Sequence, residues 1–368
     1  MVIPCLNEAE TIAECVRRSF AALEGNGLAG EVIVVDNGST DGSGALAQEV
    51  GATVVLEPDR GYGNAYLAGF RAARGDYIVM IDADLTYDFD EIPAFVGELD
   101  RGAQFVMGNR MGGVQEGAMS PLSRIGNPLL SGFLNLVFHT TVSDAHCGMR
   151  AIRRDVLPEL RLRSSGMEFA SEMVIRASRV GLRTSELPIK LHARAGDSKL
   201  SPFRDGWRHL RLMLVHSPNF LFILPGATMV VLGAVIIVLV FADVSLAGRH
   251  FFVHTLIGGS LLVIIGAQVL GLGLCGRAYG VMHLGDRDPR FERAAARLRL
   301  EHGLLLGGIV TLGGLALGGT IVAKWIDNGF GTLGEERLAI LAATFVIVGI
   351  QIFFTSFLLS IIAMRDRS

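Results

Sequence analysis

The sequence changes character near residue 215, and this change constrains the fold more than any other feature. Charged and turn-forming residues are frequent before this point, whereas long uncharged runs dominate after it. Half of the 368 residues are hydrophobic, which indicates a membrane component. We therefore predict a soluble-type domain followed by a membrane domain, with the boundary near the HSPNF segment at residues 216–220.

Four segments of the second part are long and apolar enough to cross a bilayer, because a transmembrane helix needs about 20 apolar residues. Their approximate ranges are 219–242, 252–276, 303–325 and 338–363. Their central parts contain no Asp or Glu, although ion-coupled transport usually needs ionisable groups at this depth. The glycine-rich run LLLGGIVTLGGLALGG indicates close helix packing. We expect a four-helix membrane domain that serves as an anchor or as a groove for lipid.

The charges of the connecting loops predict the orientation in the membrane. The connection between the second and third spans carries six arginines, whereas the short connection after the third span is mainly acidic. The positive-inside rule then places the long loop, the first domain and the carboxyl-terminal tail in the cytoplasm. The first ten residues lack the order of a cleavable signal, and the four cysteines form no CxxC pair. Both observations are consistent with a cytoplasmic first domain.

The segment just before the first span, at residues 203–218, predicts an amphipathic helix. Such a helix beside a transmembrane span is typical of the membrane interface, where basic residues contact anionic headgroups. The alternative is an ordinary amphipathic helix that packs on the soluble domain. The apolar face holds Phe203, Trp207, Leu210 and Leu214, and the basic face holds Arg204, Arg208 and Arg211.

The first part of the chain alternates short apolar strands with helices up to about residue 191. Continuous apolar strands between helices predict a mainly parallel sheet that is covered on both faces, as in Rossmann-like α/β folds. In such sheets ligands bind at the carboxyl ends of the strands. Three of these ends are polar, with the sequences PCLNE, DNGSTDGS and DADLTYD. We expect them to converge on one crevice.

The DADLTYD segment predicts a metal site. Asp82 and Asp84 flank Ala83, so on an extended backbone both carboxylates point to the same side. They could share one Mg²⁺ or Mn²⁺ that takes further oxygens from a substrate diphosphate. The alternative is a solvated turn or a helix cap, and we assign Asp88 to that role.

Asp36 ends another apolar strand and is predicted to contact a nucleotide base or ribose, whereas Thr40 or Asp41 is predicted to cap the next helix. The RGYGNAYLAG segment contains GxG but lacks the GxGxxG of a dinucleotide site, and no Walker loop is present. The net charge of −3 gives no support to a nucleic-acid partner.

These motifs in this order resemble family 2 of the inverting glycosyltransferases, which have the GT-A fold, and more narrowly the dolichyl and polyprenyl-phosphate mannose and glucose synthases. The resemblance covers about residues 1–202 and includes GNRM, DAHCGMRA and GMEFASEM. It implies a GT-A domain at 1–202, an interfacial helix at 203–218 and a four-span transmembrane domain at 219–368.

The resemblance also implies roles for individual residues. Thr86 occupies the place where mannose synthases often carry a metal-binding Gln, which weakens an assignment to GDP-mannose alone. The segment 127–139 follows Arg124 directly, and we expect it to contact the membrane and to guide an isoprenoid phosphate towards that arginine. The nucleotide-sugar positions are Pro4, Asn7, Glu8, Asp36, Asp82, Arg194, Ser198 and Lys199; the metal positions are Asp82, Asp84 and Thr86; and the catalytic positions are Asp84, Arg110, Arg124, Asp144 and Glu172.

The chemistry of glycosyl transfer agrees with these roles. A metal would stabilise the charge of the departing nucleoside diphosphate, and the surplus of cationic side chains indicates a second phosphate in the site. A phosphate monoester is largely dianionic at neutral pH, so it can attack without a general base. A hydroxyl acceptor would instead need a carboxylate such as Asp144, Glu168 or Glu172.

We therefore expect an enzyme that transfers glucose or mannose from UDP-glucose or GDP-mannose to a polyprenyl or dolichyl phosphate at the cytoplasmic face of the membrane. Transfer to a hydroxyl of a lipid or glycan is the first alternative. A non-catalytic membrane protein that senses nucleotide sugars, or a transporter subunit, is the second.

Overall fold

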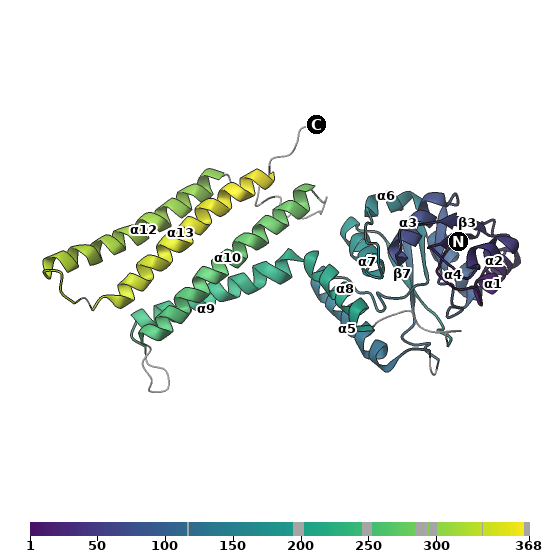
Figure 1. Ribbon diagram of the computed structural model, residues 1–368, viewed down its shortest axis with the longest axis horizontal. Helices are drawn as coiled ribbons and strands as arrows, with labels where there is room; N and C mark the ends of the chain where they lie inside the picture. The colour runs from purple at the N-terminus through teal and green to yellow at the C-terminus, as the bar shows by residue number, and fades with distance from the viewer. Residues whose placement is uncertain are drawn as a thin grey trace. The chain divides into compact units, whose positions relative to one another are not determined.

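The computed structural model describes residues 1–115, 118–193, 202–244, 252–283, 291, 293, 300–332 and 334–363. Arg194, Ser198 and Lys199 lie outside these described residues. The chain divides into two compact units, Met1–Met213 and Leu214–Ser368, and each is described here by itself (Figure 1). The limits predicted for the domains, at residues 202 and 218, stay predictions.

A seven-stranded sheet forms the centre of the first unit, in the order β3-β2-β1-β4-β6-β5-β7. β4 and β5 pair with β6 in the antiparallel sense, and the other strand pairs of the sheet are parallel. The mainly parallel α/β sheet predicted from the sequence is thereby confirmed. The strands are β1 (Val2–Cys5), β2 (Ile33–Asp36), β3 (Thr53–Leu56), β4 (Tyr77–Met80), β5 (Phe105–Asn109), β6 (Arg150–Arg153) and β7 (Thr184–Pro188).

Helices cover both faces of the sheet. Successive residues of a strand point to opposite faces, so each strand contributes side chains to two apolar layers. Ile3 belongs to an apolar layer beneath α1, α2 and α4, whereas its neighbour Val2 belongs to a layer beneath α3, α5, α7 and α8. The helices are α1 (Ile12–Gly25), α2 (Ser43–Glu49), α3 (Tyr62–Ala72), α4 (Ile92–Asp100), α5 (Pro121–Phe138), α6 (Leu157–Leu160), α7 (Phe169–Val180) and α8 (Pro202–Val215).

The antiparallel direction of β6 brings an additional segment to the functional edge of the sheet. Arg150 begins β6 and is paired with Met80, which ends β4, and with Met107 near the end of β5. Residues 144–149 therefore reach the edge where β1, β2, β4 and β5 end. The sequence predicted convergence at this edge but not the strand that reverses direction there.

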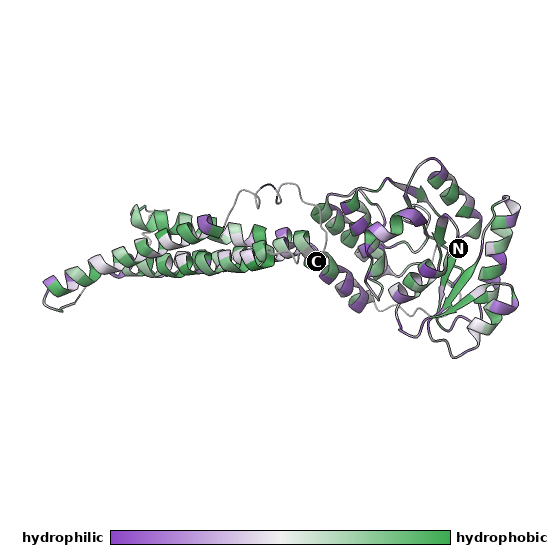
Figure 2. Cartoon of the chain, turned by 90° about the horizontal axis from the view of Figure 1, so that it is seen from above, coloured by the Kyte–Doolittle hydropathy of each residue, from purple (hydrophilic) through white to green (hydrophobic). Residues whose placement is uncertain are grey.

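The second unit consists of long apolar helices: η3 (Asn219–Ile223), α9 (Leu224–Phe241), α10 (Val253–His283), α12 (Leu300–Asp327) and α13 (Glu336–Ala363). Four stretches within them, with η3 and α9 forming one, are long and apolar enough to span a membrane, which confirms the four predicted spans. Figure 2 shows the hydrophobic colouring that runs along them.

Glycines allow these helices to approach closely. A Cβ at Gly233 of α9 would overlap backbone atoms of α10, and a Cβ at Gly314 of α12 would overlap backbone atoms of α13. Close packing without bulky side chains is the usual way in which transmembrane helices associate. Within the glycine-rich run of the third span, Gly307 and Gly314 have the packing role that the sequence predicted, whereas Gly308 and Gly313 have open space around them.

Candidate active site

Hydrogen bonds tie the loop after β1 to the loop after β2. The Asn7 side chain accepts a hydrogen bond from the backbone nitrogen of Thr40 at 2.8 Å, and Asn7 itself has a φ of 52°. The backbone nitrogen of Glu8 donates to the hydroxyl of Ser43 at 2.9 Å, and that of Ala9 donates to the Asp41 carboxylate at 3.0 Å. The two loops therefore form one connected wall of the crevice.

Asp36 lies at the end of β2 and is 9% exposed. Its carboxylate accepts a hydrogen bond from the backbone nitrogen of Ser39 at 2.8 Å, and a Cβ at Gly44 would touch its other oxygen. The next residue, Asn37, donates to the carbonyl oxygen of Glu57 at 2.9 Å and accepts from the backbone nitrogen of Gly61 at 2.6 Å. This side chain therefore fixes the loop that leads into α3.

The two aspartates of the DADLTYD segment each accept from nearby hydroxyl groups. Asp82 Oδ1 accepts from the Tyr62 hydroxyl at 3.0 Å, and the Tyr66 hydroxyl lies 3.5 Å away. Asp84 Oδ1 accepts from the hydroxyl of Thr86 at 2.6 Å and from its backbone nitrogen at 3.1 Å. Thr86 therefore contacts a predicted metal ligand directly.

Arg110 and Asp144 form a buried ion pair with two hydrogen bonds. The Arg110 Nε–Asp144 Oδ2 distance is 2.6 Å and the Arg110 Nη2–Asp144 Oδ1 distance is 2.8 Å. The Asp144 side chain is fully buried, and it also accepts from the backbone nitrogens of Arg110 and His146. Both residues were predicted as catalytic positions, but their separation of 34 residues carried no signal that they form a pair.

A buried polar cluster connects this pair to helix α8. Ser171 Oγ lies 2.8 Å from His209 Nδ1 and 3.4 Å from His146 Nε2, and the two imidazole rings are 4.4 Å apart. Burial, and then the neighbouring His209, holds the pKa of His146 well below its ordinary value. Burial also lowers the pKa of His209 to about 4. Both histidines are therefore neutral at physiological pH.

Helix α8 uses two faces differently. His209 and Met213 are buried against the catalytic unit, whereas Phe203 and Trp207 are 85% and 59% exposed. The sequence offered packing on the domain and contact with the membrane as alternatives. In the structure one face of α8 packs on the domain, and the other face is exposed and available for contact with the membrane.

Glu172 and Arg150 hold backbone segments near the crevice. The Glu172 carboxylate accepts from the backbone nitrogens of Arg163 at 3.0 Å and Ser164 at 2.7 Å. The buried Arg150 guanidinium donates to three carbonyl oxygens, among them that of Ala145 at 2.7 Å. Arg150 was not predicted from the sequence. The available signal was a charged residue at the start of an apolar strand.

Arg124 occupies a different environment from Arg110. It is exposed on α5, between Leu122 and Ile125, which are 52% and 65% exposed. Leu129, one turn further along, is 68% exposed. An arginine among exposed apolar side chains is suited to a surface that contacts lipid.

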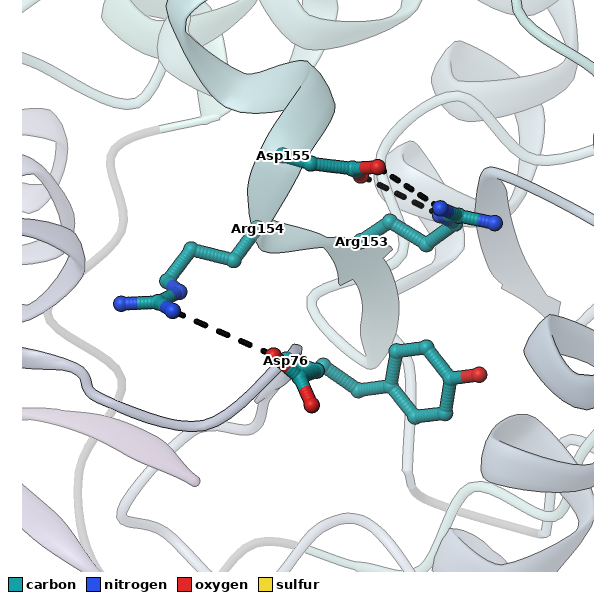
Figure 3. A pocket seen from close by; sticks show the side chains of 5 residues that line it. Asp76, Arg153, Arg154 and Asp155 are labelled. Atoms are coloured by element: carbon teal, nitrogen blue, oxygen red, sulfur yellow. Dashed lines mark hydrogen bonds and ion pairs between the residues drawn. The ribbon is translucent and has the colours of Figure 1, made fainter.

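A separate cavity of about 540 Å³ lies at the opposite edge of the sheet, where β4 begins and β6 ends (Figure 3). Arg153 pairs with Asp155 at 2.6 Å, and Arg154 lies 3.9 Å from Asp76. These are solvent-exposed ion pairs, and no residue predicted for catalysis lines the cavity. We therefore assign the crevice at the carboxyl ends of the strands, and not this cavity, as the candidate active site.

Comparison with known proteins identifies the family of the chain. Residues 1–161 match the family described as glycosyl transferase family 2, and residues 274–363 match the glycosyltransferase family 2 C-terminal transmembrane region. The low-salt glycan biosynthesis hexosyltransferase of Haloferax volcanii is 43% identical over 363 residues, which is 98% of this chain and 87% of that protein.

A second sequence relative and a solved structure are each similar to part of this chain. The undecaprenyl-phosphate 4-deoxy-4-formamido-L-arabinose transferase of Pseudomonas fluorescens is 32% identical over 305 residues, or 79% of this chain and 87% of that protein. A mycobacterial protein of known crystal structure has the same fold, with a TM-score of 0.50 and 23% identity over 59% of this chain and 73% of its own. The chain therefore belongs to glycosyltransferase family 2 and is a multi-pass membrane glycosyltransferase with a GT-A-type domain.

Proposed function

We propose that this glycosyltransferase moves a hexose, glucose or mannose, from a nucleotide sugar to a polyprenyl or dolichyl phosphate at the cytoplasmic face of the membrane, with inversion at the anomeric carbon. The observation that carries the proposal is the state of Asp144 and Glu172, two of the three carboxylates that the sequence offered as a general base. Both accept hydrogen bonds from donors of the protein itself.

Asp144 accepts two hydrogen bonds from the Arg110 guanidinium and one from each of two backbone nitrogens. Glu172 accepts from the backbone nitrogens of Arg163 and Ser164. A carboxylate has about four lone-pair sites, so Asp144 has little capacity left to take a proton from an acceptor. This arrangement supports an acceptor that needs no base.

A phosphate monoester is such an acceptor, because it is already largely dianionic at neutral pH. The names of the relatives point the same way: the Pseudomonas fluorescens enzyme acts on undecaprenyl phosphate, and the Haloferax volcanii protein is a hexosyltransferase. UDP-glucose and GDP-mannose are the donors that we propose to test first.

The carboxylate oxygens of Asp82 and Asp84 suit Mg²⁺ or Mn²⁺, which prefer oxygen ligands. No group of three or more acidic, His or Cys side chains that could hold a metal occurs among the described residues, so water and the donor diphosphate would complete the coordination. A bound ion would act as a Lewis acid on the departing diphosphate. The Tyr62 and Thr86 hydroxyls donate hydrogen bonds to these two carboxylates.

The acceptor would approach from the lipid surface. The exposed apolar residues of α5 and α8, together with the exposed Arg124, support contact of this surface with headgroups and with the phosphate of an isoprenoid lipid. The arginine-rich connection between the second and third spans supports a cytoplasmic catalytic unit.

A radiolabelled donor assay tests the proposal with purified full-length protein, Mn²⁺ or Mg²⁺ and a polyprenyl phosphate. We expect label in the organic phase that mild acid releases, because a sugar linked to a phosphate is acid-labile. Extractable label that resists mild acid would contradict a phosphate acceptor. Absence of extractable label with every common donor would contradict lipid transfer altogether.

Transfer to a hydroxyl of a lipid or glycan is the second candidate, and one observation favours it. Glu168 Oε2 is buried and has no hydrogen-bond partner among the described residues, so this carboxylate could accept a proton. The variant Glu168→Gln separates the two functions. A loss of roughly 10²–10⁴-fold in turnover would support a hydroxyl acceptor, whereas a phosphate acceptor predicts a much smaller effect.

A further inference from the structure

The GYG sequence at residues 61–63 supplies a hydroxyl donor to Asp82, and its two glycines allow an unusually close approach of the backbone to a neighbouring loop. A Cβ at Gly61 would overlap the carbonyl oxygen of Ser165, and a Cβ at Gly63 would overlap that of Ser164. Gly61 also has a φ of 146°, a conformation that favours glycine. The backbone around Tyr62 is therefore pressed against the loop that precedes α7.

Hydrogen bonds on both sides of Tyr62 fix this backbone. The backbone nitrogen of Gly61 donates to Asn37 Oδ1 at 2.6 Å, and that of Gly63 donates to the carbonyl oxygen of Ser165 at 2.9 Å. Because Asn37 follows Asp36 at the end of β2, the position of Tyr62 is set from the strand that carries the predicted nucleotide contact.

The ring of Tyr62 is also held in place. It packs edge-on against Tyr66, with ring centroids 4.9 Å apart, and Tyr66 in turn stacks on Phe169 at 5.8 Å with an interplanar angle of 7°. The Tyr62 hydroxyl donates to Asp82 Oδ1 at 3.0 Å.

The opposite side of Asp82 is bounded by the segment that follows Asp144. A Cβ at Gly148 would overlap Asp82 Oδ2, and the backbone nitrogen of Gly148 donates to the Tyr87 hydroxyl at 2.8 Å. The carboxylate thus lies between a hydroxyl donor on one side and a glycine on the other. The hydroxyl donor therefore contributes to the orientation of the carboxylate, whereas the glycine supplies space.

We propose that Tyr62 is a positioning residue that fixes the Asp82 carboxylate for the metal and diphosphate of the donor. Tyr62 links the end of β2, through Asn37 and Gly61, to the end of β4. The role assigned to its hydroxyl is exerted through Asp82, which accepts its hydrogen bond. This inference rests on the proposed function, because it assumes that Asp82 and Asp84 bind a metal–diphosphate.

The test measures metal binding rather than turnover. Full-length protein in detergent is titrated with Mn²⁺ in the presence of UDP or GDP, and free Mn²⁺ is followed by electron paramagnetic resonance. We expect Tyr62→Phe to weaken Mn²⁺ binding about tenfold, the lower end of the effect of removing an outer-shell hydrogen bond from a metal ligand. The thermal unfolding midpoint of each variant is measured in parallel without metal.

Two matched controls make the same chemical change elsewhere. Tyr66→Phe removes a hydroxyl that lies 3.5 Å from the same carboxylate oxygen, and Tyr77→Phe removes one that donates to Asp100 at 2.9 Å on the surface. We expect less than about a threefold change in Mn²⁺ binding for Tyr66→Phe and none for Tyr77→Phe, because the strength of a hydrogen bond falls steeply with distance.

Each outcome decides between the inference and the function on which it rests. If Tyr62→Phe binds Mn²⁺ as tightly as the wild-type protein does, the inference alone is overturned. The same holds if Tyr66→Phe weakens Mn²⁺ binding as much as Tyr62→Phe does. Wild-type protein that binds no Mn²⁺ with either nucleotide overturns the inference together with the metal role of Asp82 and Asp84. A tenfold loss confined to Tyr62→Phe, without a matching fall in the unfolding midpoint, supports positioning over a general effect on folding.

Discussion

Acidification is expected to release helix α8 from the catalytic unit, because His209 is buried in a neutral state. The imidazole is 6% exposed and lies 2.8 Å from the Ser171 hydroxyl. Burial is the main reason that its pKa falls to about 4, with Asp205 opposing the shift and Arg150 adding to it. A proton on His209 would also face His146, whose ring is 4.4 Å away.

The size of the effect follows from the difference between the folded and unfolded pKa values. Between about pH 6.5 and pH 4 the unfolded chain binds a proton at this histidine and the folded chain does not, so stability falls as the pH falls through this window. A pKa lowered from 6.5 to about 4 corresponds to about 3 kcal/mol of the free energy of unfolding. His146 shifts in the same direction and adds to the loss.

Fluorescence of Trp207 provides the assay, since this residue lies on α8 two positions from His209. The chain has two tryptophans, so a Trp325→Phe background leaves Trp207 as the single reporter. Denaturant titrations between pH 7.5 and pH 4.5 should show stability falling with acidification. In His209→Gln the fall should be smaller, because the variant cannot bind the proton. Parallel curves for the two proteins would refute the reasoning.

Three further predictions concern the site and its support. Removing one partner of the buried Arg110–Asp144 pair, as in Asp144→Asn, should lower the free energy of unfolding by about 3–5 kcal/mol in chemical denaturation, because it leaves an uncompensated buried charge. Gly63→Ala should be destabilised by more than about 2 kcal/mol, since its Cβ would overlap a backbone carbonyl, whereas Gly97→Ala, with open space around it, should unfold at or above the wild-type midpoint. Arg124→Ala should raise the KM for the lipid acceptor about tenfold and leave the KM for the nucleotide sugar unchanged in the radiolabel assay; an equal change in both would place this arginine with the donor instead.

The fold was predictable from the sequence where local pattern and burial agree. The apolar run that ends before Asp82 indicated a buried strand, and Met80 and its neighbours form β4 as expected. The spans were predictable for the same reason, since about 20 uncharged residues have few soluble alternatives. Parallel strands also predicted that Asp36 and Asp82 would lie at one edge of the sheet.

The pairing of side chains was not predictable, because partners far apart in sequence leave no periodic signal. The Arg110–Asp144 pair depends on β6 running against β4 and β5, which brings residues 144–149 to the functional edge. Tyr62 and Asp82 are 20 residues apart, on different elements. Each contact appears only once the order and direction of the strands are known.

The two halves of the proposed site differ in a way that bears on how its substrates bind. Among the described residues, the proposed donor half includes buried side chains with protein hydrogen bonds, such as Asp36 and the Asp84–Thr86 contact, so these side chains need little further ordering when a nucleotide sugar binds. The surface of α5 and α8 is different, because Leu129 and Phe203 are 68% and 85% exposed. Exposed apolar area is unfavourable in water by about 25 cal/mol per Å², and a lipid surface would remove that cost. Transfer to a lipid is therefore expected to depend on the membrane more than donor binding does.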